Sequence, residues 1–320
     1  MGIQHLNTYI KEKCNHHDAI KTITFNELKG KRIVIDTSIY LYKYSAEGAL
    51  IDNMYQMIAL FKSNGIIPLF VFDGKPPPEK YKLLQSRKEE RLVAENKYKE
   101  LQEKLAEITD YDEKKEMNNE LDTLRRTFVK INYNDIENVK KLMDLSGVHY
   151  CIAEGEADQL CAKLVLNKSV YACLSDDMDL FVYGCPRILR GLSLLKSTVV
   201  MYDFKKVLDC LHISIDDFRK ICVISGTDYN YVSGRNKNIN LYKTMHYYEK
   251  FIQHEGKDFY EWLRENTTYI EDYDAIKEIE AMFDLQDLDI TKYNLQKITL
   301  KSVFKEPLHK FLEDYNFIFV

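Results

Sequence analysis

The chain has 320 residues, 45% of them hydrophobic and 12% aromatic, so it can bury a sizeable core as one large domain or two modest ones. Its formal net charge of −5 gives no global basicity, but acidic ligands can mask basic patches, so nucleic-acid binding is not excluded. No apolar run is long enough to span a membrane, no signal peptide is visible, and the 7 cysteines include no Cys-x-x-Cys pair. These features argue against a membrane protein, a disulfide framework and a structural zinc site, and we expect a soluble intracellular protein.

Three apolar runs end in aspartates and have the composition of buried strands. In chain order they are Ile33 to Ile35 before Asp36, Leu69 to Phe72 before Asp73, and Val170 to Leu174 before Asp177 and Asp179. A single aspartate cluster after a strand is usually a turn, so the repetition is what favours a site. A fourth run, ICVISGTDYN, ends near Asp228 and fits either a strand or a buried helix followed by a loop.

Long helical patterns separate these runs. Strands that alternate with helices predict an α/β fold in which a mostly parallel central sheet is flanked by helices, with right-handed crossovers. The C-terminal ends of such strands share one edge of the sheet, where binding sites form. We therefore expect the aspartates to meet at that edge.

Two glutamates in CIAEGEADQLCAKLV add to this edge. Glu154 and Glu156 stand at a predicted helix start, where the helix dipole alone also favours acidic residues. The candidate metal ligands are then Asp36, Asp73, Glu154, Glu156, Asp177, Asp179 and Asp228. These charges would repel one another without cations, and oxygen ligands select hard ions, so we expect two Mg²⁺, with Mn²⁺ able to substitute. Two such ions about 4 Å apart can generate a hydroxide and stabilise an in-line displacement, which predicts hydrolysis of a phosphate ester.

The segment after the second strand predicts a solvated helical excursion over residues 79–130. Three consecutive prolines end the strand, and a long stretch of dense mixed charge with few apolar positions follows. A surface helical hairpin laced with ion pairs fits the same pattern. Lys80 and Arg87 favour a functional interpretation, because their spacing puts them on one helix face that rises from the base of the predicted metal site. A point charge and a bidentate fork suit a scissile phosphodiester, which predicts a nuclease.

Six motifs in order resemble the flap endonuclease branch of the XPG family of structure-specific 5′ nucleases. They are MGIQHL, IDTSIYLY, FDGKPP with the following Lys and Arg, AEGEAD, DDMDL and GTDYN, and together they span residues 1 to about 230. The resemblance implies the PIN-like 5′ nuclease fold, with a helical arch at 79–130 through which a single-stranded 5′ flap passes. It also implies that the seven carboxylates bind two divalent metals directly or through water, and that Lys80 and Arg87 are the catalytic cations at the arch base.

The resemblance further implies contacts with DNA. Tyr42 falls where the family stacks an aromatic ring on the nucleobase beside the cleaved bond, although an amphipathic ring on a buried helix fits it equally. Gly2 resembles the family's N-terminal glycine near the active site. We expect Arg125 and Arg126, farther along the arch, to position DNA phosphates.

The sequence departs from the family beyond its sixth motif. The family has a glycine-rich helix-two-turn-helix hairpin that grips duplex DNA, often with bound K⁺, whereas this chain keeps Gly234 beside Arg235 and Lys237. We predict a degenerate DNA-binding element there; its geometry and its K⁺ stay open, and a solvated loop fits too. No sliding-clamp motif is visible at the C-terminus. We expect a nuclease core over 1–230 and a helical C-terminal region over 231–320, a compact arrangement that resembles members encoded by large DNA viruses.

The leading interpretation is a Mg²⁺-dependent 5′ flap endonuclease, with 5′ to 3′ exonuclease activity, that acts as a monomer on branched or flapped DNA in replication, repair or recombination. The nearest alternative is an XPG-type nuclease for bubbles or Holliday junctions, but the long segment between Asp73 and Glu154 favours a closed arch. An aspartate-nucleophile phosphatase needs a second Asp where this chain has Ser38. A catalytically inert DNA-binding scaffold would have lost ligands, and none is missing. We expect the protein in the nucleus or, for a viral member, at a cytoplasmic replication site.

Overall fold

In the part of the chain that the structure describes, seven strands form one sheet in the order β1-β7-β6-β5-β2-β3-β4. The structure is a computed structural model, and it describes residues 2–15, 18–105, 111–230, 239–253, 258–293 and 298–318. The strands are β1 (Ile20–Thr24), β2 (Arg32–Asp36), β3 (Ile67–Phe72), β4 (His149–Ile152), β5 (Ala172–Leu174), β6 (Arg187–Ser193) and β7 (Thr198–Asp203). The α-helices are α1 (Leu6–Cys14), α2 (Thr37–Ala46), α3 (Leu50–Ser63), α4 (Tyr81–Leu105), α5 (Tyr111–Thr127), α6 (Tyr133–Ser146), α7 (Ala157–Leu166), α8 (Asp179–Val182), α9 (Phe204–Leu211), α10 (Ile215–Ser225), α11 (Leu241–Phe251), α12 (Phe259–Asn266), α13 (Tyr273–Ala281) and α14 (Lys305–Glu313). Short 3₁₀ helices are η1 (Phe25–Leu28), η2 (Pro78–Lys80) and η3 (Thr291–Tyr293).

The sheet is mostly parallel, as predicted. β2 pairs in parallel with both β3 and β5, and β4 and β6 continue the parallel pairing on either side. At one edge, β7 pairs antiparallel with both β6 and β1. The three predicted strands are confirmed, the third beginning two residues later than expected. The fourth apolar run forms the end of α10, so the helix-and-loop alternative is correct.

Both faces of the sheet are covered, which explains why the strands read as continuous apolar runs. Successive residues of a strand point to opposite faces, and Val34 accordingly belongs to one apolar cluster while Ile33 and Ile35 belong to the other. Residues of α1, α7, α8, α9 and α10 build the first cluster, and residues of α2, α3, α6 and α14 build the second. The C-terminal ends of β2, β3 and β5 lie together at one edge of the sheet.

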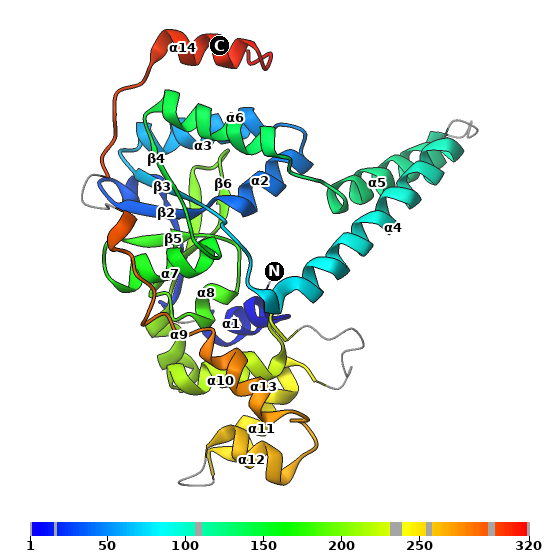
Figure 1. The fold of residues 1–320 in the computed structure, drawn as a ribbon, viewed down its shortest axis with the longest axis vertical. Coiled ribbons are helices and arrows are strands. Elements are labelled where there is room, and N and C mark those ends of the chain that lie inside the picture. Colours follow the sequence, from blue (N-terminus) through cyan, green and yellow to red (C-terminus); the bar gives the residue numbers. More distant parts are fainter. Residues whose placement is uncertain are drawn as a thin grey trace.

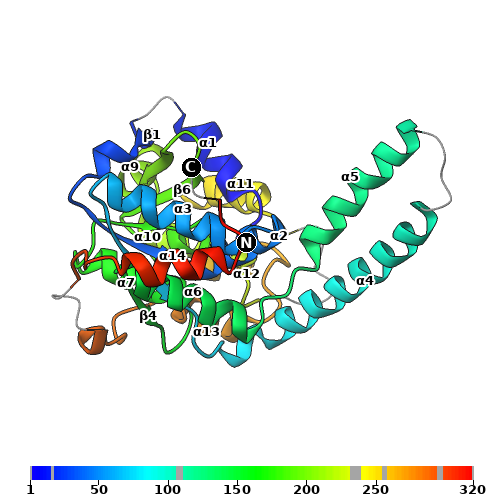
Figure 2. The same cartoon turned by 90° about the horizontal axis from the view of Figure 1, so that it is seen from above.

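The helices α4 and α5 form an arm that projects from the body (Figures 1 and 2). They pack on each other through few apolar groups, among them the buried Leu121 and Ala94 and a ring contact of 5.2 Å between Tyr98 and Phe128. This packing agrees with the few apolar positions in the sequence of this segment, and the solvated helical excursion is confirmed. Among the described helices, none combines the length and the apolar character needed to cross a bilayer.

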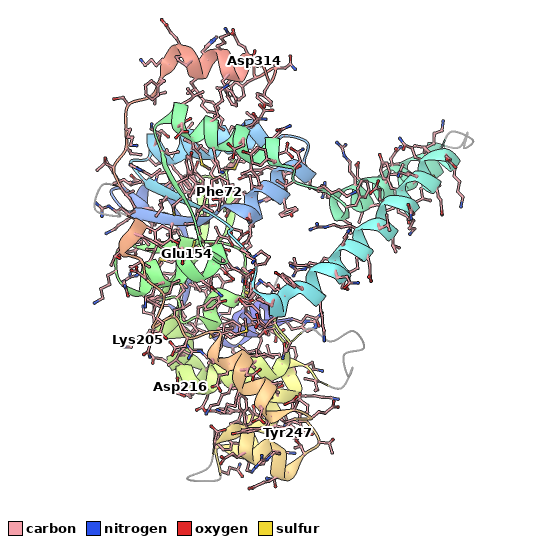
Figure 3. The ribbon with its side chains drawn as sticks, viewed as in Figure 1. Phe72, Glu154, Lys205, Asp216, Tyr247 and Asp314 are labelled. Atoms are coloured by element: carbon pink, nitrogen blue, oxygen red, sulfur yellow. The ribbon has the colours of Figure 1, made fainter. Side chains whose placement is uncertain are left out.

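The chain beyond β7 runs to one end of the molecule and then returns along the body. Figure 3 shows Tyr247 of α11 and Asp314, just after α14, at opposite ends of the long axis. Residues 282–304, of which 294–297 are not described, connect α13 to α14 and are called the strap below (Figure 1). Phe283 of the strap joins the apolar cluster on one face of the sheet, and Phe311 of α14 joins the cluster on the other.

Candidate active site

A cavity of about 510 Å³ opens at the C-terminal ends of β2, β3 and β5, where the arm meets the body. Its lining includes five of the seven predicted ligands together with three of the other predicted site residues: Asp36, Asp73, Glu156, Asp177, Asp228, Lys80, Arg87 and Tyr42. The shared edge of the parallel sheet thus brings together residues that are far apart in the sequence, as expected.

Asp36 ends β2 and is almost fully buried. Its Oδ2 accepts a hydrogen bond from the Ser175 hydroxyl at 2.9 Å. Burial, reinforced by the charges of Asp73 and Asp177, raises the pKa of Asp36 to about 8. Because desolvation dominates, the carboxyl of the metal-free protein holds a proton near neutral pH.

The loop before α7 is attached to the end of β3 through backbone contacts. The Gly74 amide donates to the Gly155 carbonyl at 2.7 Å, and a Cβ at Gly74 would overlap the Ala153 carbonyl, so only glycine permits this approach. The Ala157 amide at the start of α7 donates to Asp73 Oδ1 at 2.8 Å. These contacts explain why the FDGK and AEGEAD motifs meet at one site.

Asp179 is the most deeply buried carboxylate of the site, with 0% of its surface exposed. Neither of its carboxylate oxygens accepts a hydrogen bond from any described residue. Burial first, and then the charges of Asp177 and Asp228, raise its pKa. Gly2 lies directly against this pair: its φ is +76°, and a Cβ there would overlap Asp179 Oδ1 and lie 2.9 Å from Asp177 Oδ1. The N-terminal segment therefore reaches the carboxylates, which is the position that the resemblance implied for Gly2.

Lys80 and Arg87 converge on the carboxylates from the base of the arm. Lys80 Nζ lies 2.5 Å from Glu156 Oε1 and 4.0 Å from Asp228 Oδ2, and Arg87 Nη2 lies 2.8 Å from the same Asp228 oxygen. Lys80 ends η2, one residue before α4, yet the two side chains reach a common point as predicted. Burial alone would lower the pKa of Lys80, but the charges of Asp158 and Glu156 outweigh burial and raise it, so the ammonium is retained.

Glu154 is a predicted ligand that the structure does not bring into the cavity. Its side chain is 73% exposed and forms an ion pair with Lys292 of the strap. Its backbone nevertheless takes part in the site, because the Glu154 carbonyl accepts a hydrogen bond from the Lys75 amide at 3.1 Å. The side chain can change rotamer at little cost, since an exposed ion pair of this kind contributes little free energy.

Asp158 lines the cavity, although the sequence reasoning did not select it. It is 6% exposed and lies close enough to Lys80 to raise the pKa of that residue. Burial, followed by the charge of Glu156, raises the pKa of Asp158 itself. The signal in the sequence was an aspartate within the first turn of a helix whose neighbouring residues, Ala157 and Leu160 among them, are apolar and buried.

Of the residues predicted to contact DNA, the structure describes some and leaves others outside its described ranges. Tyr42 lies on the cavity wall with 39% of its surface exposed, and the Arg91 guanidinium lies 5.3 Å from its ring centroid. Arg125 and Arg126 are exposed in the last turn of α5. The remaining three, Gly234, Arg235 and Lys237, lie outside the described residues.

The donor set fits a hard divalent cation. The ligands would be the oxygens of Asp36, Asp73, Glu156, Asp177, Asp179 and Asp228, and the two buried Asp179 oxygens without a described partner are the clearest mark of such a site. Within the described ranges, no three acidic, His or Cys side chains are already arranged to enclose a metal. Lys80 forms an ion pair with Glu156, and Arg87 forms one with Asp228, so these two side chains offset part of the negative charge of the site.

The buried carboxyls make the metal-free protein sensitive to pH. A raised folded-state pKa means that the folded state binds more protons than the unfolded state between the unfolded value, about 4, and the folded value. For Asp36, with a folded pKa of about 8, the stabilising contribution is full below pH 4 and is lost as pH rises to 8. We expect urea unfolding in EDTA at pH 5, 6 and 7 to show a free energy of unfolding that falls with pH. Asp36→Asn should make this slope shallower by about 1.4 kcal/mol per pH unit, and an unchanged slope would contradict the assignment.

The site combines a carboxylate cavity at the edge of a mostly parallel sheet with the side chains of Lys80 and Arg87 and a helical arm. Together these features define a nuclease that hydrolyses phosphodiester bonds. Sequence comparison supports this class: the XPG N-terminal domain matches residues 1–94 and the XPG I-region matches residues 147–228. Flap endonuclease 1 of Methanococcus aeolicus is 30% identical over 92% of this chain and 87% of its own length.

Solved structures of related nucleases share the fold of this chain. Flap endonuclease-1 from Methanococcus jannaschii has a TM-score of 0.62 and 25% identity, covering 94% of this chain and 92% of its own. The catalytic core of Rad2 in complex with a DNA substrate shares the fold, with a TM-score of 0.65, 20% identity and coverage of 98% and 94%. The chain belongs to the flap endonuclease branch of the XPG family, and the resemblance seen in its motifs is confirmed.

Proposed function

We propose that the chain is a Mg²⁺-dependent, structure-specific 5′ flap endonuclease that also has 5′ to 3′ exonuclease activity and acts in DNA replication, repair or recombination. The observation that carries this proposal is the convergence of Lys80 and Arg87 on Asp228, at the point where the arm meets the carboxylate cavity. Family membership supplies the reaction class, and the arm supplies the element that a threaded single strand requires.

Each group has a distinct task in this proposal. Two bound Mg²⁺ ions, replaceable by Mn²⁺, would make the attacking water more acidic and offset charge on the phosphate. The carboxylates would hold those ions, and Glu154 would join them if its exposed side chain turned from Lys292. Lys80 and Arg87 add positive charge to the scissile phosphate from the side of the arm, already oriented toward the cavity by their ion pairs.

The DNA path follows from the same arrangement. The arm, within residues 79–130, acts as the arch that admits the 5′ flap, and Arg125 and Arg126 bind its phosphates. Tyr42 stacks on the base beside the cleaved bond. The duplex contacts a degenerate hairpin that contains Gly234, Arg235 and Lys237, with or without K⁺.

The chain divides functionally into a nuclease core, 1–230, and a helical C-terminal region, 231–320. It works on branched or flapped DNA as a monomer and without a sliding-clamp motif. Its place of action is the nucleus or, for a viral member, a cytoplasmic replication site.

A panel of labelled substrates tests the proposal. We expect purified protein in Mg²⁺ to cut a 5′ flap faster than a nicked duplex, a bubble or a Holliday junction, because only the flap offers a free 5′ strand that can pass the arm. Preferred cutting of the bubble or the junction would support the alternative XPG-type activity. Intact substrates in both Mg²⁺ and Mn²⁺ would support an inert DNA-binding scaffold. Asp177→Asn protein, purified in parallel, controls for contaminating nucleases.

A further inference from the structure

Tyr229, the residue after Asp228, forms hydrogen bonds with Glu156, Tyr183 and Gln159. It is 5% exposed, and its hydroxyl lies 2.7 Å from Glu156 Oε2 and 2.6 Å from the Tyr183 hydroxyl. The side-chain amide of Gln159 donates to the same hydroxyl at 3.3 Å. Tyr229 is the tyrosine of the GTDYN motif, and it is not one of the predicted metal ligands, so its contacts require an explanation.

The direction of these hydrogen bonds follows from counting protons. A carboxylate only accepts, so the single hydroxyl proton of Tyr229 is donated to Glu156. Tyr183 must then donate to Tyr229, as Gln159 does. The result is a one-way chain of donors that ends on one carboxylate oxygen.

Glu156 is fixed at both of its oxygens by this arrangement. Oε1 faces the Lys80 ammonium at 2.5 Å, and Oε2 accepts from Tyr229. Lys80 Nζ also lies 5.2 Å from the centroid of the Tyr229 ring, a distance suited to a cation–π contact. Tyr229 therefore contacts both members of the ion pair, one through its hydroxyl and the other through its ring.

The rings of Tyr183 and Tyr229 both pack against Phe283 of the strap. Phe283 is fully buried, and its ring centroid lies 4.9 Å from that of Tyr183 and 5.3 Å from that of Tyr229. Side chains packed this closely have little freedom to change rotamer. The orientation of the Tyr229 hydroxyl is thus set by packing as well as by hydrogen bonds.

We propose that Tyr229 is a positioning residue of the nuclease: it orients Glu156 for metal binding and holds Lys80 at the cavity, with Tyr183 and Phe283 fixing Tyr229 in turn. Groups that hold a metal ligand in place are commonly worth 10- to 100-fold in metal affinity. This proposal rests on the proposed function for its cleavage measurements, whereas metal binding by the DNA-free protein tests it separately.

The experiment compares Tyr229→Phe with wild type, since phenylalanine keeps the ring under Lys80 and removes only the hydroxyl. Mn²⁺ is titrated into DNA-free protein while electron paramagnetic resonance follows the free ion, and we expect roughly 10- to 100-fold weaker binding. The Mg²⁺ concentration for half-maximal flap cleavage should rise by a similar factor, with a smaller change at saturating Mg²⁺. In a Glu156→Gln background, Tyr229→Phe should have no further effect, because the residue it acts through is already altered.

Tyr202→Phe is the matched control. Tyr202 is 1% exposed, donates its hydroxyl proton to Asn7 Oδ1 at 2.9 Å, and has the Arg190 guanidinium 5.9 Å from its ring centroid. Tyr202→Phe therefore removes the hydroxyl hydrogen bond of a buried tyrosine that does not line the cavity. We expect a lowered Tm with unchanged Mn²⁺ binding.

Wild-type Mn²⁺ affinity in Tyr229→Phe, or equal weakening in Tyr202→Phe, would overturn the proposal and leave Tyr229 a packing residue. If Tyr229→Phe does not fold, Tyr183→Phe decides: it removes one donor to Tyr229 and must weaken Mn²⁺ binding in the same direction by a smaller factor. Failure of wild type to cut flaps, alongside weakened Mn²⁺ binding in Tyr229→Phe, would reject the proposed function and keep the positioning role.

Discussion

Replacing Asp177 with Asn is expected to abolish flap cleavage in Mg²⁺ while DNA binding is largely preserved, and Asp179→Asn is expected to do the same. Asp177 lines the cavity, and Asp179 buries two oxygens that accept no hydrogen bond from the described residues. Asparagine keeps the shape of each side chain but removes one ligand charge, so a metal is displaced and the duplex contacts are not. Single-turnover cleavage and equilibrium binding on the same flap measure the two effects, and EDTA should stop wild-type cleavage.

Asp176→Asn provides a control one residue away. Asp176 lies outside the cavity lining, accepts a hydrogen bond from the Gly191 amide at 2.9 Å, and lies 3.8 Å from Arg190 Nε. We expect this variant to cleave normally. Turnover close to wild type in Asp177→Asn would reject the metal assignment, whereas a loss in Asp176→Asn would point to damage of the local fold.

Lys80→Ala and Arg87→Ala are each expected to lower the single-turnover rate on a 5′ flap by roughly 10²- to 10³-fold, the usual effect of losing one preorganised electrostatic donor. Both cations already point to the Asp228 carboxylate at the mouth of the metal site. Because they act on charge that develops in the transition state, DNA affinity should change much less than the rate. Rates at saturating enzyme, beside binding at two salt concentrations, separate the two effects.

Three other cations serve as comparisons. Arg125→Ala and Arg126→Ala should weaken affinity and flatten its salt dependence, with a smaller effect on chemistry. Lys62→Ala controls for loss of a partly buried lysine, since Lys62 bonds the Ser146 carbonyl and does not line the cavity. Near-normal rates for Lys80→Ala and Arg87→Ala would leave the arm a surface element and the chain an unspecified metal-dependent phosphodiesterase.

The gathering of Asp36, Asp73 and Asp177 was predictable because a parallel sheet leaves only one edge where strand ends meet. The short apolar runs predict where the strands end. The arm was predictable as well, because its segment shows a long helical pattern with few apolar residues. The ambiguity of the run before Asp228 was also inherent, since a short apolar segment buried on all sides has no distinguishing period. Only its packing as α10 against α8, α11, α12 and α13 decided between helix and strand.

Other features depend on partners that no local pattern reveals. Glu154 and Glu156 look equivalent in the sequence, yet one pairs with Lys292 of the strap and the other with Lys80. Asp158 was hidden because an acidic residue in a first helical turn has an ordinary explanation in the helix dipole. The orientation of such side chains is set by tertiary contacts, which the sequence specifies only through the whole fold.

Both faces of the sheet are completed by residues that are synthesised late. Phe283 and Ile298 join the apolar cluster on one face, and Leu308, Phe311 and Leu312 join the cluster on the other. A ribosome releases the N-terminal part first, so one face of the nascent sheet keeps uncovered apolar surface until Phe283 and Ile298 emerge, and the other face keeps it until α14 emerges. Premature termination shortly before α14 would therefore impair folding of the catalytic part and favour aggregation, although it removes none of the residues that line the cavity.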